Sequence, residues 1–227
     1  MIILNILLGW LIVSGALLVF YAWRGMIAAW REPVLKRPVL IIESDDWGAG
    51  TIEQVASIKQ ISHVLEKFVD RDRCRPVMTL GMILATADGE KTLSSGNYQR
   101  QEISCSSHGP LLEAIKGGVE AGVFSIQLHG MEHYWPPALL LASKTDKAVG
   151  DWLAHAPQLT TEELPSSIQS RWVDSSILPS QHLDTISIKQ AVQEEVDAFQ
   201  QIFGCVPQGV VPPTVIWTEE GAEAWAA

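Results

Sequence analysis

The sequence predicts an α/β fold with a parallel sheet, preceded by one transmembrane helix. Three short apolar runs alternate with amphipathic patterns of helical period, the order expected of parallel strands joined by helices. An uncharged apolar stretch, residues 2–23, stands before them. The chain has 227 residues, of which 47% are hydrophobic and 19% charged, so it can form one packed domain with an appendage.

The N-terminal stretch is long enough to cross a membrane. Only Asn5 and Ser14 interrupt the apolar side chains of residues 2–23. At about 1.5 Å per residue, a helix over this stretch is about 33 Å long, enough to span the hydrocarbon core. A cleaved signal peptide usually begins with a basic residue and has a shorter apolar region. We therefore expect a retained, single-pass anchor over residues 1–24.

The charges after the anchor bear on its orientation. Residues 25–37 are predicted to be a juxtamembrane linker. The basic residues at this end of the span are Arg24, Arg31, Lys36 and Arg37. An excess of basic residues marks the cytoplasmic side, so this rule places the main domain in the cytoplasm.

Composition excludes two classes of function. The net charge of −10 provides no basic field to replace phosphate counterions, so the chain is not expected to bind nucleic acid. The three cysteines, Cys74, Cys105 and Cys205, are far apart and form no CxxC pair. A cysteine-based zinc site is therefore not expected.

Residues 38–227 are predicted to form the α/β domain. The expected elements are a strand at 38–42, a helix from a Thr51 cap to Phe68, a strand at 76–80, a helix at 110–120, a strand at 123–128, a helix at 186–203 and a short strand within 207–217. Polar segments at 87–109 and at about 135–184 are predicted to be a loop and a long irregular insertion. Functional groups of such folds gather beyond the carboxyl ends of the strands.

Two polar clusters stand at predicted strand ends. Asp45 and Asp46 follow the first strand, and one carboxylate can bind a metal ion while its neighbour faces substrate. His129 and His133 follow the third, and neutral imidazole is a good ligand for zinc and similar metals. Two histidines and one carboxylate leave positions open for water and substrate. The alternative is an Asp pair in a turn and two unrelated loop histidines.

The segment 129–133 also matches the H-x-x-E-H signature of zinc peptidases, in which Glu132 would be the base. That arrangement requires a helix across the motif. A strand running into His129, Gly130 and the prolines 136–137 disfavours a helix. Glu132 is instead expected to face solvent or to support a histidine ligand.

Taken together, the clusters resemble the polysaccharide deacetylases, or NodB-homology carbohydrate esterases. That family carries an Asp-Asp motif, then His-x-x-x-His, then Arg-x-Pro after a further helix. Ser44-Asp45-Asp46, the segment 128–133 and Val211-Pro212-Pro213 are similar to the three motifs, in the same order. The resemblance covers residues 38–227 and implies a distorted, incomplete (β/α) barrel. Trp47 replaces the family's Gly, Val211 replaces its Arg, and its later motifs are missing, so we expect a divergent member and a fragment.

The resemblance implies a metal-dependent hydrolase that removes N- or O-linked acetyl groups from a carbohydrate. Asp45 would be the catalytic base, and Asp46, His129 and His133 would hold a divalent metal, zinc above all. Substrate would lie against Trp47, Pro212 and Pro213. Family members usually act outside the cytoplasm, against the charge rule, so the side of the membrane stays open.

Other readings stay open as well. The chain could be a membrane-anchored glycan-binding or scaffold protein that keeps the fold without turnover. Trp135, Trp152 and Trp172 could stack on sugar rings. Acidic residues 194, 195 and 197 are expected on the solvated face of the last helix.

Overall fold

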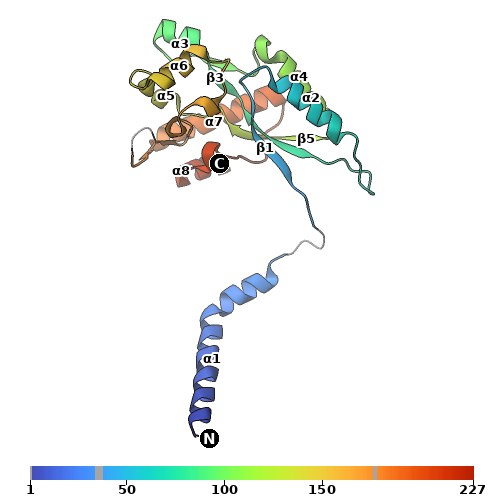
Figure 1. Ribbon diagram of the computed structural model, residues 1–227, viewed down its shortest axis with the longest axis vertical. Helices are drawn as coiled ribbons and strands as arrows, with labels where there is room; N and C mark the ends of the chain where they lie inside the picture. Colours follow the sequence, from blue (N-terminus) through green and yellow to red (C-terminus); the bar gives the residue numbers. More distant parts are fainter. Residues whose placement is uncertain (1, 34–37, 176–177) are drawn as a thin grey trace. The chain divides into compact units, whose positions relative to one another are not determined.

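The computed structural model describes residues 2–33, 38–175 and 178–227 (Figure 1). The chain divides into two compact units, Met1–Ile41 and Ile42–Ala227. The first contains a single helix, and the second contains all the strands.

The N-terminal unit is the helix α1, Ile2–Arg31, which has no buried residue. It is long and apolar enough to cross a membrane, although a signal sequence near an N-terminus meets the same criteria. It also runs past residue 24, so the first part of the predicted juxtamembrane linker, up to Arg31, is helical. The helix ends just before Pro33, which disfavours helical geometry at the preceding residue. Residues 34–37, with two of the four basic side chains, lie outside the described part.

A three-stranded parallel sheet is the centre of the second unit and confirms the predicted α/β class. Its strand order is β1-β2-β5, with β1 at Ile42–Gly48, β2 at Met78–Ile83 and β5 at Phe124–Gly130. The connecting helices are α2, Gln54–Leu65, and α4, Gly109–Glu120, which lie side by side (Figure 1). With α7, Thr185–Phe203, they contribute Ile58, Ile115 and Phe199 to the main core.

The first strand is displaced from its predicted position. Val39, Leu40 and Ile41 are exposed and belong to no strand, because pairing with β2 begins only at Ile42. The prediction of a buried strand at 38–42 is therefore wrong. The strand instead includes Asp45 and Asp46, and its register shifts between Ser44 and Trp47.

Helix predictions hold better than boundary predictions. Helices at 110–120 and 186–203 are confirmed by α4 and α7. The predicted cap Thr51 is wrong, because α2 begins at Gln54 after Glu53. The prediction of a loop at 87–109 is also wrong. This segment contains the helix α3, Gly89–Ser95, and the strand β4, Arg100–Glu102. Strand β4 pairs with β3, Ala85–Ala87.

The predicted irregular insertion is largely structured. It contains α5, Pro136–Ala142, α6, Lys147–His155, and the short strands β6, Val173–Asp174, and β7, Gln181–His182. Pro136 lies in the first turn of α5, where a missing backbone N–H costs nothing. Tyr134, Leu139, Val149, Trp152 and Leu153 belong to a second core in this region. The predicted insertion therefore contains folded helices with a hydrophobic core of their own.

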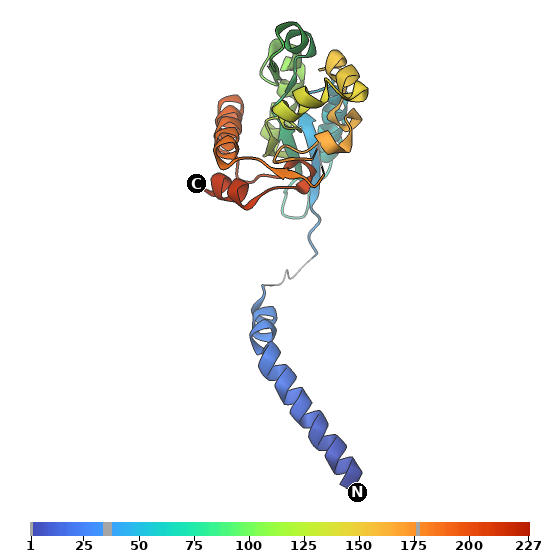
Figure 2. The same cartoon turned by 90° about the vertical axis from the view of Figure 1, so that its left-hand side faces the viewer.

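The last predicted strand, within 207–217, is reduced to one parallel bridge between Leu128 and Val210. After it the chain turns into α8, Glu219–Ala226, which packs against α7 (Figure 2). The described residues thus form a mixed α/β unit around an open three-stranded sheet. The barrel stays a prediction.

Candidate metal centre

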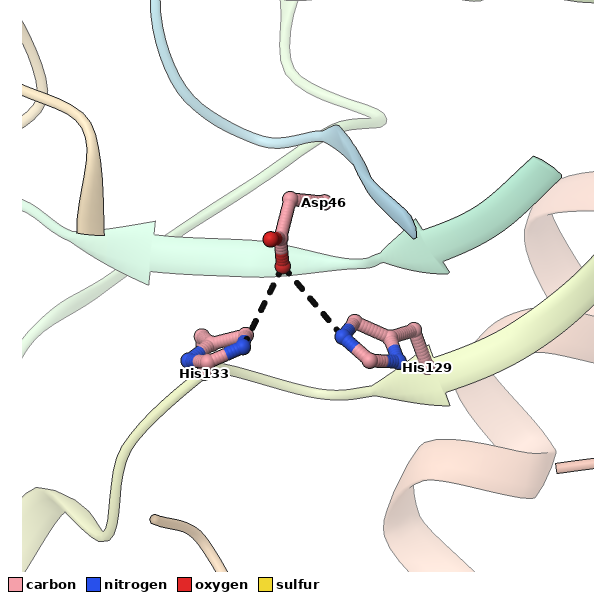
Figure 3. A group of neighbouring side chains, drawn as sticks. All are labelled: Asp46, His129 and His133. Atoms are coloured by element: carbon pink, nitrogen blue, oxygen red, sulfur yellow. Dashed lines mark ion pairs between the residues drawn. The ribbon is translucent and has the colours of Figure 1, made fainter. Parts of the chain in front are cut away.

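Asp46 lies in the irregular part of β1. Its φ of 64° is in the left-handed region, which Asp tolerates better than most residues. Gln54 braces the irregularity: its side chain accepts a hydrogen bond from the Gly48 N–H at 2.9 Å and donates one to the Asp46 carbonyl at 3.4 Å. Because of this local turn, the Asp46 carboxylate points toward the end of β5 (Figure 3).

The two histidines lie at that end. His129 is on β5, and His133 follows Gly130 after a bend. Gly130 has a φ of 144°, and a Cβ there would be 3.1 Å from the Glu132 carbonyl, so glycine is required. The two histidine side chains are 4% and 8% exposed, whereas that of Asp46 is 34% exposed. The site is therefore accessible from the carboxylate side.

The structure brings the three predicted ligands together. Asp46 Oδ1 is 3.2 Å from His129 Nε2 and 3.2 Å from His133 Nε2 (Figure 3). The three candidate ligand atoms lie within 4.8 Å of one another. Asp46, His129 and His133, hereafter the acceptor triad, could hold one metal ion.

A backbone carbonyl fixes the proton of one histidine. His129 Nδ1 lies 2.6 Å from the carbonyl oxygen of Val211, which can only accept a hydrogen bond. Nδ1 therefore carries a proton, and in the neutral imidazole Nε2 presents its lone pair to Asp46. Such an outer contact is typical of metal-binding histidines. Val211, where the resemblance expects an arginine side chain, contributes through its backbone.

Electrostatics of the triad favour a bound cation. Asp46 Oδ1 is buried and has no hydrogen-bond partner among the described residues. Burial acts to raise the pKa of Asp46, but a hydrogen bond from His129 and the charge that each imidazole has when it is protonated lower it below its ordinary value. Burial, with a smaller contribution from His129, lowers the pKa of His133 despite the nearby Asp46 carboxylate. An ionised carboxylate and neutral imidazoles are the states that metal binding needs.

Asp45, the predicted base, is exposed beside the triad. Its Oδ1 would lie 2.4 Å from a Cβ placed on Gly81 of β2, so only glycine at that position leaves room for the carboxylate. Asp45, Asp46 and Trp47 line a cavity of about 200 Å³. Pockets for drug-sized ligands usually measure about 300–1,000 Å³, so this cavity suits one small group.

The two prolines do not line the cavity at Asp45. A Cβ on Gly130 would be 3.2 Å from Pro213, which is buried. Pro212 lines a separate, largely apolar cavity of about 590 Å³ beside α7 and α8. Neither proline lines the cavity at Asp45.

A second cluster surrounds Glu132, and the sequence did not reveal it. Glu132 is fully buried, so the expectation that it faces solvent is wrong. Its carboxylate accepts hydrogen bonds from Arg171 Nη1 at 2.5 Å, from Arg100 Nε and from the Tyr98 hydroxyl at 3.1 Å. Arg100 also pairs with Glu194.

Glu195 of α7 completes this cluster. It accepts hydrogen bonds from Arg171 Nε at 3.2 Å, from the Met131 N–H at 3.1 Å and from Trp225 Nε1 at 2.9 Å. Burial raises the pKa of Glu195, against the opposing effect of Arg171. The expectation of a solvated Glu195 is therefore wrong. The cluster, hereafter the arginine network, consists of Arg100, Glu132, Arg171, Glu194 and Glu195.

The geometry weakens two alternatives. Residues 131–134 form bends, not the helix that an H-x-x-E-H peptidase requires, and Glu132 is engaged by two arginines. Trp152 and Trp172 are 2% and 1% exposed, so they cannot stack on a sugar. Trp135 is partly buried.

Comparison of the chain with protein-family models, with curated proteins and with solved structures finds no match. The fold and the site therefore define only a mixed α/β protein with a candidate three-ligand metal centre.

Proposed function

We propose that this protein is a metal-dependent hydrolase that removes acetyl groups from a carbohydrate. The observation that carries the proposal is the acceptor triad: three lone-pair atoms converge at one point, with the open side at a cavity that holds a further carboxylate. Asp46, His129 and His133 would bind the ion, and the nitrogen–oxygen ligand set suits zinc.

A bound divalent ion would supply a Lewis acid and lower the pKa of a water molecule. Asp45 lines the cavity and accepts the proton from the attacking water. The Val211 carbonyl holds the His129 ring in the orientation needed for binding. Gly81 leaves the space that the Asp45 carboxylate occupies.

Acetyl release is favoured over peptide hydrolysis for two reasons. The cavity of about 200 Å³ suits a small acyl-bearing unit, not an extended chain. The order of the motifs also resembles that of the polysaccharide deacetylases. Residues 2–23 would anchor the protein in a membrane, where an accessible glycan is the substrate.

Metal content tests the site. Zinc in the purified full-length protein is measured for the wild type, Asp46→Ala and His129→Ala. His155→Ala is the matched control, because the hydrogen bond of the His155 side chain is to the Asp151 carbonyl of its own helix. The wild type and the control should retain stoichiometric zinc and the two site variants should lose it. An unchanged zinc content in both site variants would exclude the proposed metal centre.

Activity tests the base. Asp45→Asn should keep zinc but lose about 10²–10⁴-fold in acetate release from N-acetylated chito-oligosaccharides or acetylated xylan, because the proton acceptor is gone. Full activity of this variant would exclude Asp45 as the base.

A glycan-binding protein without turnover is the second candidate. The observation that favours it is that, among the residues that the structure describes, no arginine or lysine lines the cavity beside Asp45. In this case the zinc-loaded wild type should bind chito-oligosaccharides and release no acetate.

A further inference from the structure

The cavity beside the acceptor triad has two walls of different origin. One wall consists of Asp45, Asp46 and Trp47 of β1 and the turn that follows it. The other is the segment Leu159–Glu162, which follows α6 in the region that the sequence predicted to be irregular. This segment lies more than a hundred positions along the chain from β1, so its side chains can set specificity independently of the metal ligands.

Among the described residues, every charged side chain that lines the cavity is acidic: Asp45, Asp46 and Glu162. A divalent cation in the triad would offset two of these three negative charges, and the one that remains has no basic side chain beside it in this lining. Glu163 is engaged in a capping box with Thr160, so the two neighbouring glutamates have different roles. The cavity therefore has a negative potential next to the point of reaction.

Hydrogen bonds from two side chains hold the backbone of the segment Leu159–Glu162 and the residues that follow it. Trp152 is buried in α6 and donates a hydrogen bond from Nε1 to the Thr160 carbonyl at 2.8 Å. The Gln169 amide donates to the carbonyls of Leu164 at 2.7 Å and Glu162 at 3.4 Å. The backbone that carries Glu162 is therefore held in place beside the cavity, whereas the Glu162 side chain is exposed.

We propose that Glu162 determines specificity by charge: it favours amino sugars with a free amine next to the acetylated unit and disfavours sugars with a carboxylate. This inference rests on the proposed deacetylase function and deepens it. An ammonium group is stabilised beside Glu162 and a carboxylate is repelled by it, and because Glu162 is exposed both interactions are screened by solvent.

The test compares three probes with the zinc-loaded full-length protein: a neutral N-acetylated chito-oligosaccharide, a partially deacetylated one, and an acetylated oligogalacturonate. The wild type should prefer the cationic probe and discriminate against the anionic one by about tenfold or more in kcat/KM. Glu162→Gln should remove most of this preference and Glu162→Lys should reverse it. Added salt should weaken it because the groups are partly exposed.

Glu163→Gln is the matched control. It removes the same charge one position along the chain, outside the cavity lining, and glutamine can replace glutamate in the capping box. Its preference among the three probes should match the wild type. An unchanged preference in both Glu162 variants would overturn the inference while leaving the proposed function intact.

Failure of the proposed function has a different signature. If the wild type releases no acetate from any probe, the deacetylase proposal fails, and calorimetric binding of glucosamine and galacturonate oligomers tests Glu162 alone. Charge selection is supported if the wild type binds the glucosamine oligomer more strongly and Glu162→Lys reverses this preference. It is overturned if Glu162→Lys leaves the binding of both oligomers unchanged, or if neither oligomer binds.

Discussion

The acceptor triad and the arginine network share one short segment, His129–His133, yet they differ in how their charges are matched. In the arginine network each buried carboxylate accepts hydrogen bonds from an arginine, and Glu195 also accepts them from a backbone N–H and an indole. In the acceptor triad a buried carboxylate oxygen faces two imidazole nitrogens without a donor.

This difference indicates different roles for neighbouring residues. A fully hydrogen-bonded buried network fixes geometry, and removing one partner leaves an uncompensated charge. A set of converging acceptors is unfavourable by itself and becomes favourable when a cation binds. The hydrogen bonds of the arginine network hold the segment 131–132, and the acceptor triad beside it is a candidate metal site.

The largest expected effect comes from breaking the arginine network. Arg171→Met should lower the free energy of unfolding by about 3–5 kcal/mol, because Glu132 and Glu195 are both fully buried and lose a charged partner. Urea denaturation of the full-length protein measures this. Lys147→Met, which breaks an exposed pair with Asp151, is the control and should cost less than about 1 kcal/mol. Equal, small losses in both variants would show that the network is not structural.

Zinc should act only through the acceptor triad. A ligand present at about 100 times its Kd stabilises the folded state by about 2.7 kcal/mol, so added zinc should raise the melting temperature and a chelator should reverse the rise. Asp46→Ala should abolish the zinc-dependent shift, whereas Arg100→Met should keep it at a lower starting stability. If Asp46→Ala kept the full zinc-dependent rise in melting temperature, zinc would bind outside the acceptor triad.

Alkaline pH should lower the free energy of unfolding through two buried tyrosines that lie beside the arginine network. Tyr98 and Tyr134 are 3.0 Å apart at their hydroxyls, and burial, then the charge of Glu132, raises the pKa of both phenols. A phenol whose pKa is higher in the folded than in the unfolded state contributes stability that is present below about pH 10 and is lost as the pH rises above it.

Tyr98→Phe tests this contribution. It should cost about 1 kcal/mol at neutral pH, since one hydrogen bond to Glu132 is lost, and should make stability fall less steeply with pH above 10. Unfolding followed between pH 8 and 12 measures both effects. An unchanged slope would mean that Tyr98 does not titrate with unfolding.

Local patterns predicted much of this molecule. The helices α4 and α7 follow from apolar spacing, and the parallel sheet follows from alternating elements. The triad follows from the rule that polar groups gather at strand ends. Each of these predictions depends on residues close together in sequence or on a general property of the fold.

The remainder depends on contacts between distant residues. Arg171 lies 39 positions from Glu132 and 24 from Glu195, so no local pattern links them. One signal was present: Glu195 has helical spacing to Val192 and Phe199, both buried, which places it on the apolar face of α7. The displacement of β1 depends on where its partner strand begins, which its own sequence does not encode.

The left-handed backbone at Asp46 limits which residues can replace it. Glycine adopts this conformation without penalty, whereas other residues pay roughly 1–2 kcal/mol. The replacement that best suits the backbone thus deletes the ligand, and asparagine, which also tolerates it, deletes the charge. Aspartate at residue 46 therefore carries a backbone cost that glycine would avoid, and it keeps the carboxylate that faces the two imidazoles.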